Sequence, residues 1–363
     1  MDYIRILKKI KFSAILFFMT TKEKILDALE KNLGAKVSGQ ALANECMVSR
    51  AAVWKAINSL RQDGCEIEGH ENGGYTLKEK SDFFSKEIFC RYLAEFFPKF
   101  KNCPVECFKE IDSTNTYAKK ILAQASSLHT KNGGLSEEGE KIHQRIILAE
   151  SQSAGRGRLG RNFISPAKTG IYLSIIYVPK GGISEPARLT AFTAVAVVRA
   201  IKKLFSVDAK IKWINDIYIE EKKVCGILTE GFTNFESGQI EAAVIGIGIN
   251  ICDNADVKKA AKVAGSITGK KNKSDVSRCQ LAAEVAGQTL NLLQEDAAPV
   301  MEEYKANSFL VGRTVEIHPV IGQEKNSYFA KVIDIDDKAG LVVELSDKSK
   351  RTLSSGEVSL HQE

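Results

Sequence analysis

Residues 152–161 read Gln-Ser-Ala-Gly-Arg-Gly-Arg-Leu-Gly-Arg, so three glycines and three arginines share the seven positions from Gly155 to Arg161. Glycine has no Cβ, so the backbone N–H groups of such a loop can turn inward around a ligand. Arginine adds a permanent charge and a planar fork of donors that suits phosphate and carboxylate groups. A loop that combines both residue types is therefore a candidate clamp for an anion.

The same glycines match the dinucleotide-binding pattern G-x-G-x-x-G. That pattern has meaning only between a strand and a helix, with an acidic residue about 20 positions later. A strand is predicted before the loop, at residues 145–150, but Pro166 and a β-like run at residues 171–178 follow it instead of a helix. Residues 178–182 carry no acidic side chain. These departures argue against a nicotinamide site, and the loop alone is equally compatible with a solvated basic surface loop.

Four further motifs accompany the loop. They are Ile111-Asp112-Ser113-Thr114-Asn115 before it and, after it, Lys212-Trp213-Ile214-Asn215-Asp216, Lys223-Val224-Cys225-Gly226-Ile227-Leu228 and Gly246-Ile247-Gly248-Ile249-Asn250. In this order and spacing the motifs resemble the biotin protein ligases, and in particular the bifunctional biotin ligase/biotin operon repressors. The resemblance extends over nearly the whole chain after Met19.

Length and composition are those of a globular protein with two or three domains. The chain has 363 residues, of which 44% are hydrophobic and 26% are charged, and both fractions are ordinary. The net charge of +6 permits nucleic-acid binding without requiring it. The eight cysteines include no C-x-x-C pair and the five histidines are dispersed, so we expect reduced cysteines, mostly in the core, and assign no metal site.

Residues 1–19 combine basic residues with a short apolar run, Phe12–Met19, in the manner of a signal peptide. The run is at the short limit for such a peptide, no small-x-small cleavage site follows it, and it is far too short to cross a bilayer. We therefore interpret this stretch as the product of an upstream start codon, with a short surface-seeking helix as the alternative. A cytoplasmic protein without membrane attachment is expected.

Residues 20–80 predict a winged helix-turn-helix. Thr20 and Glu23 form a capping box for a first helix, and Ser38 and Ser49 are the expected N-caps of two more. Residues 65–77 then read as a hairpin, because turn residues separate two β-like runs. The alternative is a small helical domain that binds another protein.

The third of these helices is predicted to bury Val53, Trp54, Ile57 and Leu60 on one face. Its other face is polar and basic, which suits a helix that lies in the major groove of DNA. The residues expected to bind DNA are Ser49, Arg50, Ala51, Lys55, Asn58 and Arg61.

The rest of the chain predicts an α+β fold with two more domains. Residues 85–308 combine a mixed sheet with helices at 115–124 and 186–205 and a helical hairpin at 276–307, and the resemblance implies a catalytic domain of the class II synthetase-like, biotin/lipoate ligase type. Short strands at residues 311–363 predict a small SH3-like β-barrel. Residues 125–144 are expected to be a flexible surface insertion, and residues 254–274 a mobile lysine-rich stretch.

The resemblance also implies a reaction. Biotin and ATP would form biotinyl-5′-AMP with the help of Mg²⁺, and a lysine of a biotin carboxyl carrier protein would then accept the biotin. The implied catalytic cations are Lys223 and Arg158. The implied biotin-binding residues are Ser113, Thr114, Asn115, Gln152, Arg156, Gly157, Arg158 and Lys223.

The resemblance also implies that ATP is bound by Asn215, Asp216 and Asn250, but it does not assign a separate role to each residue. Trp213 is expected either to stack on a ligand or to lie in the core. Operator DNA and a ligand-promoted homodimer are the other implied partners.

The sequence departs from the family pattern in two places. Ile214 stands where proline is frequent, and the loop after Asn250 lacks a tryptophan that some members place over adenine. Two alternatives share the predicted fold: a lipoate or octanoate ligase or transferase, and a non-catalytic biotin-sensing regulator.

Overall fold

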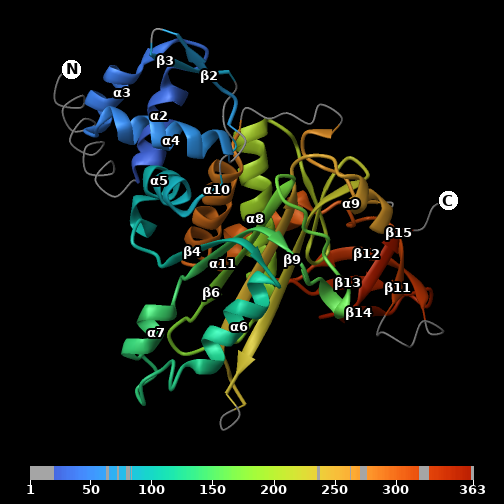
Figure 1. The fold of residues 1–363 in the computed structure, drawn as a ribbon. Helices are drawn as coiled ribbons and strands as arrows, with labels where there is room; N and C mark the ends of the chain where they lie inside the picture. Colours follow the sequence, from blue (N-terminus) through green and yellow to red (C-terminus); the bar gives the residue numbers. More distant parts are fainter. Residues whose placement is uncertain are drawn as a thin grey trace, which may run out of the picture.

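The computed structural model describes residues 20–62, 65–71, 73–78, 82, 84–234, 238–261, 263–269, 276–318 and 327–360, so the apolar run Phe12–Met19 lies outside the described residues. Within them, three units follow one another along the chain (Figure 1). The exact domain boundaries remain a prediction.

The first unit is the predicted winged helix-turn-helix. Its elements are α2 (Thr21–Lys31), β1 (Val37–Ser38), α3 (Gly39–Cys46), α4 (Arg50–Gln62), β2 (Ile67–His70) and β3 (Gly74–Leu77). The three strands form an antiparallel sheet in the order β1-β3-β2. The capping box at Thr20 and Glu23 is present, and the Ser38 and Ser49 hydroxyls accept backbone N–H groups at the starts of α3 and α4, as the sequence predicted.

One residue of this unit differs from the expectation. Val53, Ile57 and Leu60 of α4 are buried, but Trp54 is 62% exposed. Because an α-helix turns by about 100° per residue, Trp54 lies beside the apolar stripe that Val53 belongs to, not on it.

The second unit is built on a seven-stranded mixed sheet in the order β4-β5-β6-β10-β9-β8-β7. Only β4 and β5 run parallel; the other neighbouring pairs are antiparallel. The strands are β4 (Val105–Ile111), β5 (Ile146–Gln152), β6 (Gly170–Tyr177), β7 (Lys210–Lys212), β8 (Asp216–Ile219), β9 (Lys222–Thr233) and β10 (Ile240–Asn250).

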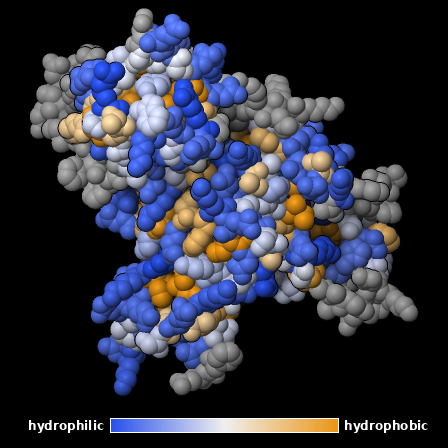
Figure 2. All heavy atoms as spheres, viewed as in Figure 1, coloured by the Kyte–Doolittle hydropathy of each residue, from blue (hydrophilic) through white to orange (hydrophobic). Residues whose placement is uncertain are grey.

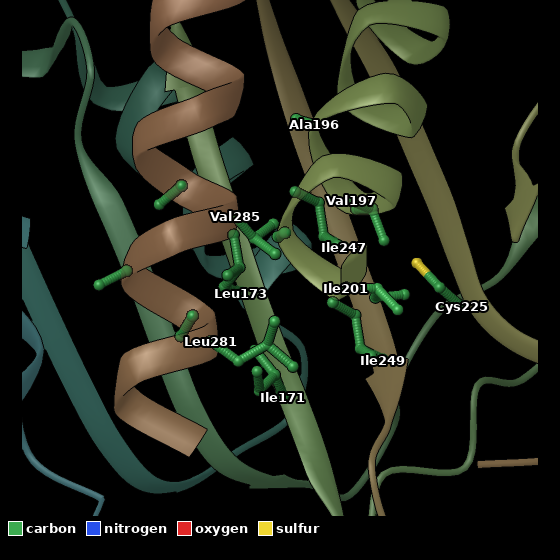
Figure 3. Close-up of a cluster of buried hydrophobic side chains, with 14 of the residues drawn as sticks. Ile171, Leu173, Ala196, Val197, Ile201, Cys225, Ile247, Ile249, Leu281 and Val285 are labelled. Carbon is green, nitrogen blue, oxygen red and sulfur yellow. The ribbon is translucent and has the colours of Figure 1, made fainter. Parts of the chain in front are cut away.

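Helices cover both faces of this sheet. On one face α8 (Pro186–Phe205) and α10 (Arg278–Leu292) pack side by side, and Figure 3 shows their apolar side chains meeting those of β6, β9 and β10. On the other face α6 (Thr114–Gln124) packs against Ile147, Ile176 and Val244. Successive side chains of a strand point to opposite faces, so Ile175 and Ile176 belong to different clusters. The remaining helices are α5 (Lys86–Phe96), η1 (Pro98–Phe100), α7 (Glu137–Ile142), η2 (Arg158–Gly160), α9 (Ala255–Ala260) and α11 (Ala297–Asn307).

Two stretches predicted to be mobile contain ordered structure. Residues 125–144 include α7, and Leu128 and Ile142 are buried in the cluster under α6. The prediction of a flexible insertion was wrong because these two apolar anchors stand in an otherwise polar stretch. Within residues 254–274, α9 is capped by Asn254, while residues 262 and 270–274 lie outside the described part.

Polar contacts fasten the first unit to the second. The Ser85 hydroxyl, which caps α5, donates to Glu23 Oε1 of α2 at 2.9 Å, and Arg91 of α5 pairs with Asp27. Further along, the buried Arg278 pairs with Asp82, in the connection between the units, and with Glu150 of β5. The two units therefore share a polar interface as well as apolar packing.

The third unit is a five-stranded antiparallel sheet in the order β14-β13-β12-β11-β15. Its strands are β11 (Thr314–His318), β12 (Tyr328–Ile335), β13 (Leu341–Glu344), β14 (Lys350–Leu353) and β15 (Glu357–Leu360). This order is compatible with the small barrel predicted, although no pairing of β14 with β15 closes it among the described residues.

The surface in Figure 2 is mainly hydrophilic, with small apolar patches. The first unit shows the same distribution of hydrophilic and apolar residues. None of the helices in the described ranges is long and apolar enough to cross a membrane.

Candidate functional site

A floor of glycines marks the site on the sheet. Residues paired directly across antiparallel strands share a face, and Gly246 lies between Ser174 and Leu228, while Gly248 lies between Tyr172 and Gly226. A Cβ on Gly246 would lie 2.1 Å from Asn115 Oδ1, and one on Gly248 would lie 2.4 Å from the Phe163 ring. The missing side chains therefore leave the room in which α6 and the glycine–arginine loop approach the sheet.

The first turn of α6 holds a buried polar cluster over this floor. Ser113 is the N-cap, and Ser113, Thr114 and Asn115 are each less than 5% exposed. The Ser174 hydroxyl donates to Asn115 Oδ1 at 2.6 Å and lies 2.7 Å from the Thr114 hydroxyl. Gln152, at the end of β5, accepts the Thr114 N–H at 2.9 Å. Thr114 thus contacts Gln152, and both Thr114 and Asn115 contact Ser174, which the sequence did not single out.

Glu230 of β9 fixes the other side of the cluster. Its carboxylate accepts from Asn115 Nδ2 at 2.9 Å and pairs with Lys119 at 2.7 Å and with Arg156 of the loop at 3.4 Å. Burial raises the pKa of Glu230, but the contacts with Lys119, Asn115 and Arg156 outweigh it and leave the pKa below its usual value. Glu230 therefore stays ionised at neutral pH and orients the Asn115 amide.

The glycine–arginine loop folds back on itself over the site. Gly157 N–H donates to Arg161 O at 2.7 Å, and Phe163 N–H donates to Gly155 O at 2.8 Å. Between them the backbone turns sharply, because Leu159 and Gly160 both have positive φ, 58° and 74°. The return segment places the Phe163 ring over Gly248.

Two arginines of the loop reach the far side of the site. Arg158 donates to Asn215 Oδ1 at 2.9 Å and to Gly356 O at 3.3 Å, and Arg161 pairs with Glu357 at 2.7 Å. The loop is thus held against the start of β15 in the third unit.

Lys223 lies at the edge of the glycine floor. Its ammonium pairs with Asp216 at 2.7 Å and would lie 3.5 Å from a Cβ on Gly226. Lys212 of β7 pairs across the sheet with Asp216 of β8 and is close enough to be affected by both charges: burial lowers the pKa of Lys212, Asp216 raises it and Lys223 lowers it further. Positive charge is therefore concentrated beside the predicted cation, partly neutralised by one carboxylate.

Asn250, the third residue assigned to the ATP side, lies at the end of a different strand from Asn215 and Asp216. It ends β10, is 9% exposed and pairs with Gly170. Across the described ranges, no hydrogen bond joins its side chain to Asn215 or Asp216. It stands two residues beyond Gly248 and so faces the same side of the sheet.

Trp213 is in the core. It is 4% exposed, and its indole N–H donates to Ala339 O, in the turn between β12 and β13, at 2.8 Å. Of the two expected roles the structure therefore supports the one in the core, where this residue joins the second unit to the third. The peptide bond to Ile214 is cis.

A pocket of about 420 Å³ runs along the loop. Gln152 is the one predicted biotin-binding residue in its wall, and neither Arg158 nor Lys223 borders it. The wall is formed by Glu110, Ser151, Gln152, Ser153, Ala154, Gly155, Asn162, Phe163, Ile164, Ser165 and Pro166. The pocket thus marks the Gln152 end of the site only.

The predicted DNA-binding residues lie on the outer side of α4. Ser49, Arg50, Ala51, Lys55 and Arg61 are exposed, and Asn58 is partly so. Arg61 also donates from Nε to Ile67 O of β2 at 2.9 Å, which ties the helix to the hairpin.

Four residues of the site were not predicted from the sequence: Ser174, Phe163, Glu230 and Lys212. Lys212 and Phe163 lie within or directly after quoted motifs and could have been included on that ground. Ser174 and Glu230 are single polar residues in strands, and the pattern gives no signal for them.

Comparisons with known proteins agree with this picture. The model of the biotin/lipoate A/B protein ligase family matches residues 108–250, and that of an HTH domain matches residues 21–76. The bifunctional ligase/repressor BirA of Bacillus spizizenii is 27% identical over 347 residues, which cover 93% of this chain and 98% of that protein. BirA of Escherichia coli is 27% identical over 327 residues, covering 89% and 92%.

Among solved structures, the biotin protein ligase from Aquifex aeolicus in complex with biotin and ATP superposes with a TM-score of 0.55 at 22% identity. The match covers 72% of this chain and 99% of that one, and supports the fold of the second and third units.

Proposed function

We infer that this chain is an ATP-dependent biotin protein ligase that also represses transcription. It is similar to bifunctional ligase/repressors over almost its whole length, and the resemblance found in the sequence is thereby confirmed. The observation that carries the inference is the presence, in one chain, of a winged helix-turn-helix and of a polar, cation-lined site on the sheet of a ligase-like domain.

In the first step a carboxylate oxygen of biotin attacks the α-phosphorus of ATP. The new bond is a mixed anhydride, biotinyl-5′-AMP, and pyrophosphate leaves with the electron pair of the broken P–O bond. Negative charge crowds at phosphorus, so catalysis needs fixed cations and precise positioning. We assign these cations to Lys223 and Arg158, which face the site from β9 and from the loop.

The biotin ring would lie beside the first turn of α6, over the part of the glycine floor that the Phe163 ring covers here, so Phe163 would have to move off Gly248 to admit it. A ureido group has N–H donors and a carbonyl acceptor, so it needs short polar partners of both kinds. Ser113, Thr114, Asn115 and Gln152 supply them at the first turn of α6 and the end of β5. Arg156 and Gly157 would close the loop over the ligand, and the Phe163 ring would cover it.

The nucleotide would extend from Lys223 toward Asn215, Asp216 and Asn250. Mg²⁺ is commonly held by one or two carboxylates together with substrate phosphates. Asp216 offers one carboxylate, and the described residues contain no group of three His, Cys, Asp or Glu side chains that could hold a metal ion. Asp216 is the residue that would hold Mg²⁺ beside the phosphates, where the metal would supply charge neutralisation.

In the second step an uncharged lysine amine attacks the anhydride carbonyl. The C–N bond of an amide forms, AMP leaves, and the amine proton passes to solvent. We propose a biotin carboxyl carrier protein as the acceptor, because carboxylases carry biotin on such a lysine.

Repression would require two copies of the chain. One winged helix offers few phosphate contacts, and repressors of this architecture place two-fold dimers on palindromic half-sites. If the loop orders around biotinyl-AMP and borders the dimer surface, ligand shifts the population toward the dimer and so toward DNA. We therefore propose a homodimer promoted by biotinyl-AMP.

Exchange of labelled pyrophosphate into ATP tests the ligase. The purified chain should catalyse exchange with biotin and not with lipoate. Exchange with lipoate alone would identify a lipoate ligase, and no exchange with either would identify a non-catalytic regulator. Gel-shift titration of the same protein with biotin plus ATP, and with biotin alone, tests repression: tighter DNA binding is expected with both substrates.

A further inference from the structure

Trp54 is an exposed aromatic residue on the helix predicted to read DNA. Burying a tryptophan stabilises a fold through some 150–250 Å² of contact area. This ring is nevertheless 62% exposed, while the neighbouring Val53 is 1% exposed. A single exposed apolar residue needs no explanation by itself, so its surroundings decide whether it has a role.

Two arginines lie on the same ridge of α4. Arg50 is four residues before Trp54 and Arg61 seven after it, and both spacings place side chains on one helix face. Arg61 donates to Ile67 O of β2, and a Cβ on Gly73, in the turn of the hairpin, would lie 3.6 Å from the Arg50 guanidinium. Trp54 therefore lies between two cations on the exposed side of the helix, and the side chains of both cations reach the hairpin.

This arrangement matches the chemistry of double-stranded DNA. Arginines at the two ends of the ridge suit the phosphates that border a groove. An apolar surface between them suits a base edge, and the only apolar group exposed in the major groove is the C5-methyl of thymine. A protein partner would not require the flanking cations.

We propose that Trp54 contacts thymine methyl groups in the major groove and contributes to the choice of operator sequence. The inference rests on the proposed repressor function and adds to it a base-reading residue that is not polar. The charged neighbours position the protein on the backbone, and the tryptophan reads sequence.

The test needs a duplex that the protein itself selects. The full-length chain, with biotin and ATP, is used to select duplexes from a randomised library. The selected duplex is then compared with the same duplex in which uracil replaces thymine, which removes only the methyl groups. Affinity for both is measured for the parent, Trp54→Ala and the control Leu33→Ala, which removes a 45% exposed side chain of the same unit.

The expected results form a double-mutant cycle. Trp54→Ala should weaken binding to the thymine duplex roughly tenfold. Uracil should weaken binding by the parent and leave the Trp54→Ala variant unaffected. The salt dependence of binding should not change in Trp54→Ala, since no charge is lost, whereas Arg50→Ala should lower the slope by about one per half-site.

Fluorescence gives a direct readout of the same contact. The chain has two tryptophans, and Trp213 is 4% exposed, so quenching by acrylamide reports mainly on Trp54. The selected duplex should protect the parent from quenching, and this protection should be absent in Trp54→Phe, which retains only Trp213.

Three results would overturn the proposal: unchanged affinity of Trp54→Ala, an equal effect of uracil on parent and variant, or an equal loss in Leu33→Ala. Failure of the parent to bind any duplex would instead remove the repressor function on which the proposal rests, and would leave the ligase function standing.

Discussion

Replacing Glu230 by glutamine should weaken biotin binding without disturbing the chemical step. The carboxylate orients Asn115 at 2.9 Å and holds Lys119 at 2.7 Å, while Arg156 is more distant at 3.4 Å. Glutamine has the same shape but no charge, so it retains one acceptor oxygen and turns charge-assisted hydrogen bonds into neutral ones.

The size of the effect follows from these contacts. A hydrogen bond to a charged group stabilises by about 1.5–3 kcal/mol and a neutral one by about 0.5–1.5 kcal/mol, so the contact with Asn115 should lose about 1 kcal/mol. The Lys119 pair is partly exposed to solvent and adds at most about 1 kcal/mol. At most this total of about 1–2 kcal/mol can be lost from the preorganisation of the biotin site, which caps the rise in the KM for biotin at roughly fivefold to thirtyfold.

The assay is pyrophosphate exchange as a function of biotin concentration, with thermal unfolding as a check on the fold. A rise in KM at nearly constant kcat indicates loss of binding that is equal in ground and transition state. Because the pKa of Glu230 lies below its usual value, the difference from the parent should be constant across the neutral pH range. Glu241→Gln is the control, since Glu241 accepts a hydrogen bond from Asn234 at 2.9 Å on the neighbouring strand. An unchanged KM in Glu230→Gln, or an equal rise in the control, would refute the reasoning.

Three further predictions concern the cations and the interface between the first two units. Lys223→Ala should lower kcat for adenylate formation by about 10²–10³, measured by pyrophosphate exchange, because a fixed charge beside the developing phosphate charge is lost; exchange at the parental rate would remove Lys223 from catalysis. Arg158→Ala should release biotinyl-AMP roughly tenfold faster in single-turnover experiments, because its bonds to Asn215 and Gly356 hold the loop closed; unchanged release would return Arg158 to a solvated role. Burial, helped by a hydrogen bond with Glu87, raises the pKa of Glu23 to about 7. The protonated form of Glu23 therefore stabilises the folded state. This contribution to stability is fully present below the pKa of the unfolded chain and is lost as pH rises through 7. The melting temperature of the parent should therefore fall from about pH 5 to about pH 8 more than that of Glu23→Gln, and parallel curves would contradict this.

Much of the fold could be predicted because local signals and burial agree. Helix α8 begins at Pro186 and ends at Phe205, as its first-turn proline and apolar period indicated. The cap of α6 was predicted to be either Ser113 or Thr114, and Ser113 caps the helix through its hydroxyl. Leu128 and Ile142 show the opposite case. These two apolar residues anchor an otherwise polar stretch to the core and keep it ordered, whereas its average composition predicts a flexible loop.

The parts of the site that could not be predicted depend on contacts between distant segments. Glu230 lies 115 residues from Asn115, 111 from Lys119 and 74 from Arg156, and only the pairing of β9 with β10 brings them to one face of the sheet. Glu230 and the three residues that contact it are common residue types in their own segments, so no local sequence pattern marks the cluster. From the sequence alone, a glutamate in a predicted strand is expected to face solvent, and only the strand order of the sheet shows that Glu230 faces the site.

Trp54 was misplaced for a related reason. The residue type suggested the core, whereas the helical angle, one residue from Val53, placed it on the flank of the apolar stripe. The stripe of Val53, Ala56, Ile57 and Leu60 already has the i, i+3, i+4 and i+7 spacing that a helix needs in order to bury one face. Position therefore outweighs hydrophobicity, and an aromatic ring that geometry excludes from the core is available for contact with another molecule.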